Sequence, residues 1–307
     1  MNSLCSHILE LALRKPVAAV ERLLGVQRTK VLLSHRKVRF GGGIIGVLVV
    51  AAILGPVVSP YDPTAQVLNE RLSPPSLMHP LGTDTLGRDI ATRLVYGARI
   101  SLSLAVAVTA VRVGIGTTVG VLAGYVGGSV DTVLSRVVDI QLAFPGLVLA
   151  LAVAGILSPG LWSLLLAVSV VGWASYARVA RSSTLSVKQQ PFVQAAKLYG
   201  TPRRRIVRRH LFPTVVNPII VLAALDLGMV VITTATLSFL GLGAQPPTAE
   251  WGTMVEAGRD HLRAAWWLVA TPAIVIAATV IGFNLLGDGL QDVLDSGHQA
   301  VGERRET

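Results

Sequence analysis

Six apolar stretches dominate this sequence, and each is long enough to cross a lipid bilayer, which takes ~20 residues in a helix. They cover residues 41–59, 100–124, 133–157, 161–177, 214–242 and 265–286. None alternates apolar and polar residues as a membrane β-strand does. The chain has 52% hydrophobic and 14% charged residues, which argues against a soluble enzyme, since soluble domains carry roughly 25% charged residues. We therefore predict an all-α polytopic membrane protein with six transmembrane helices.

The distribution of Lys and Arg predicts how these spans are oriented. In a six-span chain, residues 1–40, 178–213 and those after 286 share one side of the membrane and hold nineteen Lys and Arg, against five on the other side. Cytoplasmic loops carry such a basic excess, so both termini are expected in the cytoplasm, in a multi-pass protein of the cytoplasmic membrane. The net charge of +10 is then a consequence of topology. No nucleic acid partner is expected, because the aromatic–basic interleaving of a nucleic-acid groove is missing.

The spans divide the chain into three parts. Residues 1–40 form a basic cytoplasmic segment, 41–290 the transmembrane domain and 291–307 a cytoplasmic tail. Within the first part, residues 8–24 carry apolar residues near helical spacing with basic flanks, which leaves two readings: a helix lying on the inner membrane surface or a tail without stable structure. The first span is not typical of a cleavable signal peptide, because a long basic segment precedes it and no A-x-A site follows.

A search for catalytic motifs finds none. No lysine follows a glycine as a phosphate-binding P-loop requires, no His-Glu pair opens an HExxH zinc motif, and no serine stands in G-x-S-x-G. The six histidines are scattered without ligand spacing, and the single Cys5 rules out a disulfide framework. We predict that the chain is not an enzyme and holds no metal or cofactor, so any ATP and magnesium would bind to other subunits.

The loop between the fourth and fifth spans has the clearest local sequence pattern. Residues 178–213 contain nine Lys and Arg and no acidic residue. The segment FVQAAKLYG predicts a short helix that ends at Gly200, because glycine tolerates the left-handed conformation that follows a helix. Thr201 and Pro202 then predict a turn into a second helix, and Pro213 marks re-entry into the membrane. This loop either binds a partner protein through its two helices, or it is a basic segment that lies on anionic lipid with an attraction of ~1 kcal/mol per charge.

The segment QAAKLYGTPRRRIVRRHLFP resembles the EAA loop of binding-protein-dependent ABC importer permeases, in which E-A-A, three residues, G and nine residues precede I-x-L-P. Ala195, Ala196, Gly200 and Pro213 are in register with that pattern. Gln194 replaces the Glu, His210 the Ile and Phe212 the Leu, so a salt link through that Glu cannot form here. The segments 79–102, 123–146, 237–255 and 283–295 also resemble the C-subunit type of dipeptide, oligopeptide and nickel permeases, with Gln291 and Ser296 as local departures.

This resemblance implies a MetI-like bundle that forms half of a path for peptides or a related small solute. It implies three kinds of partner besides the lipid bilayer: a second homologous permease, a pair of cytoplasmic ATPases docked on residues 190–213, and an extracytoplasmic substrate-binding protein. The ATPases, not this chain, would hold ATP and Mg. Two alternatives are an ion-coupled secondary carrier and a membrane scaffold without transport activity.

Four polar residues stand within the predicted spans: Arg112, Asp139, Asp226 and Asn284. A charge at the bilayer centre costs ~2.5–3.5 kcal/mol on insertion scales, so each should face protein or water. Arg112 is expected either to form a structural ion pair with Asp226 or Asp139, or to line the translocation path. Pro145, Pro218 and Pro272 are expected to break or kink their spans.

The external segment 60–98 carries four charged residues close together, Asp84, Arg88, Asp89 and Arg93. Asp89 and Arg93 have the i,i+4 spacing of a helical ion pair, and Asp84 or Thr85 is the predicted helix N-cap. The segment is either a self-contained cap on the bundle or, as the resemblance implies, a docking surface for the substrate-binding protein.

Overall fold

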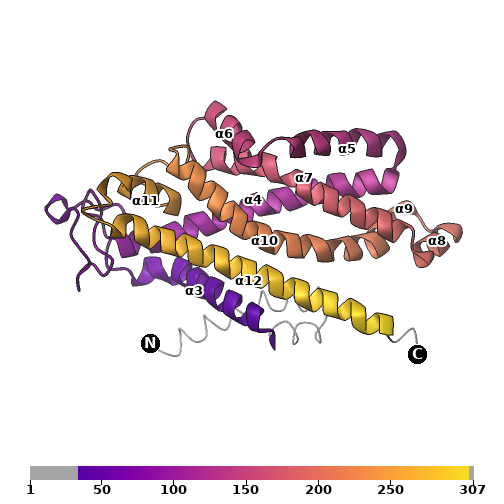
Figure 1. The fold of residues 1–307 in the computed structure, drawn as a ribbon, viewed down its shortest axis with the longest axis horizontal. Coiled ribbons are helices and arrows are strands. Elements are labelled where there is room, and N and C mark those ends of the chain that lie inside the picture. Colours follow the sequence, from indigo (N-terminus) through magenta and orange to yellow (C-terminus); the bar gives the residue numbers. More distant parts are fainter. Residues whose placement is uncertain (1–33, 304–307) are drawn as a thin grey trace.

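The computed structural model describes residues 34–303, and within them the fold is helical apart from loops and one isolated bridge between Thr83 and Asp89. Five helices are long and apolar enough to cross a membrane, which agrees with the predicted class. They are α3 (Arg36–Val58), α4 (Ile90–Val126), α7 (Leu161–Lys188), α10 (Phe212–Phe239) and α12 (Trp267–Glu303). They lie side by side in an elongated bundle (Figure 1). The two readings of residues 8–24 lie outside the described residues.

The third predicted span, 133–157, is broken at Pro145, as the sequence predicts. It consists of α5 (Gly128–Ala143) and α6 (Gly146–Ile156), which are bent by 91° relative to each other. The cause is Pro145, which has no N–H for a helical hydrogen bond and which pushes the preceding residue out of the helical region. Phe144 is extended, with φ −88° and ψ 139°. If this bent pair counts as one span, the total is six.

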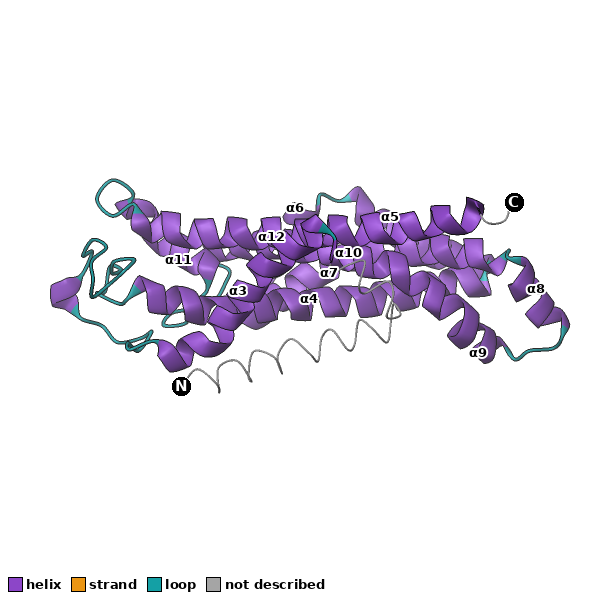
Figure 2. Ribbon diagram, turned by 90° about the horizontal axis from the view of Figure 1, so that it is seen from below, coloured by secondary structure: helices purple, strands orange, loops and turns teal. Residues whose placement is uncertain are grey.

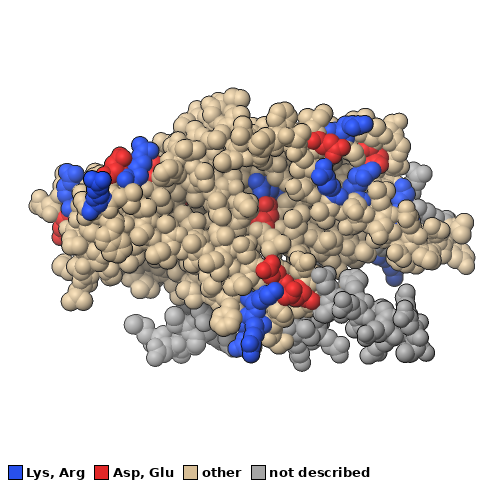
Figure 3. All heavy atoms as spheres, in the orientation of Figure 1, with Lys and Arg blue, Asp and Glu red and all other residues tan. Residues whose placement is uncertain are grey.

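Short elements gather at the two ends of the bundle (Figures 1 and 2). One end holds α8 (Pro191–Leu198), α9 (Arg203–Ile206) and the π-helical turn η2 (Val207–Leu211). The opposite end, called the cap below, consists of residues 59–89 and 240–266 and contains η1 (Leu68–Glu70), α11 (Trp251–Gly258) and η3 (Arg259–His261). Figure 3 shows charged side chains in groups toward the two ends of one face, with a small pair at its centre and a further group at its lower middle, separated by uncharged surface.

Close contact between α4 and α7 forms the centre of the bundle. Gly116, Gly120 and Gly124 lie at intervals of four residues on α4, and a Cβ atom at any of them would collide with α7. Such small residues let two membrane helices approach until their backbones touch, where packing rather than hydrophobicity holds them. A similar approach joins α3 to α12 at Gly41, because a Cβ there would lie 2.6 Å from the Gly282 carbonyl oxygen. The last helix continues past the predicted boundary at residue 290, so residues 291–303 are a helical extension of α12.

Candidate functional site

The helix α8 ends in the way the sequence predicts. Gly200 has φ +72°, a conformation that favours glycine. The Thr201 N–H donates to the Ala196 carbonyl oxygen at 3.0 Å, which is the six-to-one hydrogen bond of a Schellman motif. The prediction of a short helix closed by Gly200 is therefore confirmed. No heavy atom lies within 4 Å of a Cβ built at Gly200, so only backbone conformation restricts the residue at this position.

Opposite faces of α8 have different surroundings. Val193 is fully buried and packs with Ile206 and Leu211 in a small apolar cluster at this end of the bundle. Ala195 and Ala196 are half-buried, and Gln194 is exposed with its side-chain amide donating to the Gln189 carbonyl oxygen at 3.2 Å. On the outer side, Leu198 and Tyr199 are each 88% exposed. The apolar cluster thus anchors one side of the helix, and the large side chains of Leu198 and Tyr199 are exposed on the other.

The chain continues without a break from α9 through η2 into α10, and this candidate membrane span begins beside Pro213, where the sequence predicted re-entry. His210 lies within the π-helical turn, and Pro213 stands in the first turn of α10. A proline ring conflicts with the carbonyl group four residues earlier in an α-helix. Here the Phe212 N–H donates to the Val207 carbonyl oxygen, five residues back, and this wider turn just before Pro213 accommodates it.

Arg112 is held in a buried network that joins three helices. Its Nη1 donates to both carboxylate oxygens of Asp226 on α10, at 2.8 and 3.0 Å. Its Nε and Nη2 donate to the Val168 carbonyl oxygen on α7, at 3.0 and 2.7 Å. The Tyr176 hydroxyl donates to Asp226 at 2.9 Å. Gly172 makes room for the guanidinium, because any Cβ there would overlap it. Asp226 is therefore the partner of Arg112, and this is one of the two pairings that the sequence predicted.

The other predicted intramembrane residues do not join this network. Asp139 on α5 is exposed and pairs with Arg178 on α7 at 3.0 Å, and Asn284 is exposed on α12. The sequence search also missed a charged cluster near the end of α4. There Arg181 donates to Asp131 at 2.5 and 2.7 Å, and Lys188 donates to the Tyr125 carbonyl oxygen at 2.9 Å. Arg181 and Asp131 are 50 residues apart in sequence, so no local sequence pattern predicts that they form an ion pair.

The four charged residues singled out in the cap are buried, at 4–7% exposure. They therefore hold the cap together and contribute little to its outer surface, in contrast to the docking role considered from the resemblance. The Arg88 Nε donates to Asp84 at 2.6 Å, and the Leu86 N–H donates to the same carboxylate at 2.8 Å. Asp84 thereby closes a loop and does not cap a helix, so the N-cap predicted at Asp84 or Thr85 is wrong.

The N-cap of α4 is Asp89, which accepts hydrogen bonds from the Thr92 N–H and hydroxyl, both at 2.7 Å. Within the described cap, Asp89 makes no ion pair with Arg93, although their spacing suggested one. Arg93 instead lies 3.6 Å from Asp84 and donates to the Pro63 carbonyl oxygen at 2.8 Å. The helix begins later than the sequence pattern indicated, and this shift changes the partner of each charge.

His79 is the main residue of the cap that the sequence search did not find. Its Nδ1 lies 2.9 Å from Asp89 and its Nε2 lies 3.1 Å from Glu70, so the imidazole bridges two carboxylates. Burial disfavours the charged imidazolium, but the hydrogen bonds and charges of Asp89 and Glu70 outweigh burial and raise the pKa of His79 above its ordinary value of 6.5. The imidazole therefore ties η1 to the start of α4 most strongly when it is protonated.

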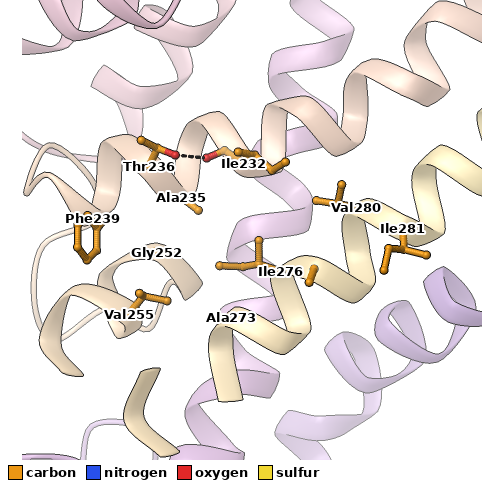
Figure 4. A pocket seen from close by; sticks show the side chains of 11 residues that line it. Ile232, Ala235, Thr236, Phe239, Gly252, Val255, Ala273, Ile276, Val280 and Ile281 are labelled. Atoms are coloured by element: carbon orange, nitrogen blue, oxygen red, sulfur yellow. Dashed lines mark hydrogen bonds between the residues drawn. The ribbon is translucent and has the colours of Figure 1, made fainter. Parts of the chain in front are cut away.

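A hollow of about 520 Å³ lies between α10, α11 and α12. Figure 4 shows side chains from all three helices around it. Its lining is apolar except for Thr236, whose hydroxyl donates to the Ile232 carbonyl oxygen at 2.8 Å within its own helix. This surface suits apolar contacts better than the polar backbone of a peptide. Among the residues that the structure describes, no three His, Cys, Asp or Glu side chains are grouped to hold a metal ion.

Known proteins match this chain over most of its length. Residues 116–298 match the family described as binding-protein-dependent transport system inner membrane component, and residues 27–75 match the N-terminal TM domain of oligopeptide transport permease C. The probable D,D-dipeptide transport system permease protein DdpC of Escherichia coli is 42% identical, over 82% of this chain and 85% of that protein. The dipeptide transport system permease protein DppC of Haemophilus influenzae is 40% identical, over 82% and 88%.

The fold has a solved counterpart in the MetNI methionine ABC transporter in inward-facing conformations. The TM-score is 0.54 at 19% sequence identity, with 66% of this chain and 96% of that chain covered. This likeness shows a shared MetI-like fold, consistent with the five or six membrane-spanning segments.

The chain belongs to the family of inner membrane permease components of binding-protein-dependent ABC importers. Within that family it falls in the branch of the C subunits of dipeptide and oligopeptide systems. It is therefore a multi-pass membrane transport component and not itself an enzyme. Family membership sets aside both alternatives, the ion-coupled carrier and the scaffold.

Proposed function

We propose that the chain forms one half of the path by which dipeptides or other short peptides enter the cell, driven by ATP hydrolysis on partner subunits. The support for peptides is that the similar permeases named above belong to dipeptide systems. A second homologous permease supplies the other half of the path. ATP and Mg bind to two cytoplasmic ATPase subunits, and an extracytoplasmic binding protein delivers the substrate to the cap.

The helix α8 is the proposed contact with an ATPase, and its exposed apolar surface is the observation that carries this proposal. Leu198 and Tyr199 are each 88% exposed and adjacent at the end of the helix, so a partner that docks here would bury both. The Schellman motif at Gly200 fixes the end of the helix. A rigid helix with an apolar outer side is suited to fit a groove on another protein.

Movement of α8 has a continuous physical route into the bundle. Val193 of α8 packs on Ile206 and Leu211, which lead directly into α10. Asp226 of α10 then bonds Arg112 of α4 and Tyr176 of α7. A displacement of α8 by an ATPase would therefore shift α10 against the α4–α7 pair, and this is the coupling between nucleotide state and path that an importer requires.

Polar groups left exposed in the spans fit a chain that is covered by a partner. Asp139, Arg178 and Asn284 are exposed, although a polar group facing lipid is costly. We expect the second permease or an aqueous path to lie against them.

The proposal is tested by placing a charge on the outer side of α8. In Leu198→Glu, the reconstituted complex should lose at least about tenfold of its uptake and of its ATPase stimulation by loaded binding protein, because a buried unpaired carboxylate costs several kcal/mol at an interface. Ser186→Glu is the matched control, since Ser186 is exposed near the end of α7 and lies outside α8. Normal stimulation and uptake in Leu198→Glu, at normal complex yield, would exclude α8 as the ATPase contact.

A further inference from the structure

The bent pair α5–α6 packs on α7 and lies on one face of the bundle (Figure 1). The break between its two helices, residues 143–146, is exposed. A helix that breaks within a membrane span leaves backbone polar groups without helical partners, and this is tolerated only where protein or water lies against the break. This face of α5–α6 is therefore not turned to lipid.

An exposed ion pair lies on the same face, one helical turn before the break. Asp139 of α5 accepts a hydrogen bond from Arg178 of α7 at 3.0 Å, and the two side chains are 56% and 62% exposed. About 15 Å of helix, at ~1.5 Å per residue, separates Arg178 from Lys188 at the end of α7. Figure 3, in the orientation of Figure 1, shows a group of charged side chains over α5. Charges at that depth need water or polar partners.

A polar hollow of about 100 Å³ lies beside this pair, between α4, α5 and α7. Ser135, Asp139, Arg178 and Arg181 contribute its polar walls. A hollow of this size and polarity holds a few water molecules. Water next to the pair favours an aqueous path, and not the packed surface of a second permease, as what lies against it.

The remaining charges of this face leave the Asp139–Arg178 pair available. Asp131 and Arg181 neutralise each other, and Lys188 donates to two backbone carbonyl oxygens. Arg136 is exposed on α5 and has no ion pair among the described residues. Within the pair itself, the described contacts use one oxygen of the carboxylate and one nitrogen of the guanidinium. The pair therefore offers one charge of each sign to a solute.

We propose that a passing peptide exchanges the bond between Asp139 and Arg178 for bonds to its own two charged ends. Its ammonium group binds Asp139, and its carboxylate binds the guanidinium of Arg178. This inference rests on the proposed function and names the substrate class as zwitterions. The charged ends are common to short peptides of any sequence, so one neutral pair suits cargo with varied side chains. An exposed pair contributes little to stability, so its exchange costs little.

The first test asks whether water reaches the pair. In a Cys5→Ser background, Ile140→Cys places a thiol beside Asp139, at a side chain that is 62% exposed. Val47→Cys on α3 is the matched control, an aliphatic position in another span that is 69% exposed. A charged methanethiosulfonate reagent, applied to both sides of membranes holding the complex without ATP, attacks thiolates, which form in water and not in lipid. We expect Ile140→Cys to react and Val47→Cys to stay unreactive. An unreactive Ile140→Cys would mean that lipid or a second permease covers this face and would overturn the proposal.

The second test asks what the pair recognises. Alanylalanine, its N-acetyl form, its C-terminal amide and the doubly blocked form are compared as protectants of Ile140→Cys. Alanylalanine should protect at a concentration about tenfold lower than the doubly blocked form needs, the worth of a hydrogen bond to a charged group. Equal protection by all four probes would overturn the proposal.

Single variants then assign each end of the peptide, in the Ile140→Cys background. In Asp139→Asn, alanylalanine should protect no better than its N-acetyl form, and in Arg178→Gln no better than its amide. Arg136→Gln is the control, because it removes an exposed cation of the same face without touching the pair. It should keep the preference for alanylalanine, and a loss equal to that in Arg178→Gln would show a bulk charge effect and overturn the proposal. If a variant does not assemble, the four probes on the Ile140→Cys protein decide.

Uptake of alanylalanine with ATP and the binding protein is measured separately in the wild-type complex. Absent uptake beside the expected protection pattern would support the peptide site and overturn the proposed function. Normal uptake beside equal protection by all four probes would support the proposed function and overturn this inference alone.

Discussion

Arg112 carries a charge in the middle of a membrane-spanning helix, and its guanidinium is bonded to two neighbouring helices, α7 and α10. Its side chain is 6% exposed and that of Asp226 is 16% exposed. The guanidinium bonds Asp226 and the Val168 carbonyl oxygen together, so its loss leaves the Asp226 carboxylate buried without its cation and with the Tyr176 hydroxyl as its described donor. This geometry favours a structural role for Arg112 over direct contact with substrate.

We predict that Arg112→Leu reduces the yield of intact complex more than it alters the ranking of transported substrates. Removing one partner of a buried pair costs about 3–5 kcal/mol, because the other charge stays buried without compensation. The measurement is complex yield in detergent beside uptake of several peptides. The double variant Arg112→Leu with Asp226→Leu should recover yield relative to Arg112→Leu, since no uncompensated charge remains. Normal yield with a changed substrate ranking would instead place Arg112 on the path.

His79 makes the cap sensitive to pH. Its folded-state pKa lies above the unfolded value of about 6.5, so the folded cap binds the proton more tightly than the unfolded chain does. The stabilisation is therefore complete below pH 6.5 and is lost as the pH rises through the raised pKa. The groups responsible are Glu70 and Asp89, which lie on either side of the imidazole.

We predict that hydrogen-exchange protection of residues 70–89 falls as pH rises above 6.5, after correction for intrinsic exchange rates. In His79→Gln, which keeps a hydrogen-bonding side chain without a titratable charge, protection should no longer depend on pH in this range. Equal pH dependence in both proteins would assign the effect to another group.

At the scale of elements, α8 depends on one backbone conformation. Gly200 adopts φ +72° with free space around its Cα, so a substitution there acts through backbone strain and not through collision. A β-branched residue in this region costs about 1–3 kcal/mol. That is enough to misplace an eight-residue helix without unfolding the bundle.

We predict that Gly200→Val uncouples ATP hydrolysis from uptake while the binding protein still docks at the cap. Gly200→Asn is the matched control, because asparagine tolerates the left-handed conformation, and it should retain most of the coupling. The measurement is ATPase activity with and without loaded binding protein, beside uptake. Wild-type ATPase stimulation and wild-type uptake in Gly200→Val, at normal expression, would show that the loop is only a basic segment at the membrane surface.

For the whole molecule, the two ends differ in architecture as well as in predicted location. One end presents α8 on its own small apolar cluster, and the other presents a cap whose charges are paired internally. Between these ends, the Arg112 network joins α4, α7 and α10. This division fits a protein that contacts an ATPase on one side of a membrane and receives solute on the other.

We predict that these ends face opposite sides, with the cap outside. In a Cys5→Ser background, Gln66→Cys in the cap and Ser186→Cys near α8 both place a thiol at an exposed position. A membrane-impermeant maleimide should label Gln66→Cys in intact cells and Ser186→Cys only after permeabilisation. Labelling of Ser186→Cys from outside would contradict the charge-based orientation.

The sequence alone determined the features that depend on neighbouring residues. Long apolar stretches must form helices in a bilayer, because each backbone hydrogen bond has to be met within the segment. The end of α8 could be predicted for the same reason, since the residues from Ala196 to Thr201 contain the whole motif that ends the helix. Family membership followed from these local patterns and their order along the chain.

Only the tertiary structure decided which distant groups meet. Arg112 had two candidate carboxylates, and it pairs with Asp226, 114 residues away, because α10 packs against α4 and α7 at that level. Pro145 predicted a break in its span, but not the 91° angle between α5 and α6. The sequence left Arg88 and Arg93 with two readings, a self-contained cap or a docking surface, and the structure buries both side chains, with Arg93 donating to the Pro63 and Pro247 carbonyl oxygens. Pairing and burial arise from the three-dimensional packing of helices, and spacing along the chain does not encode that packing locally.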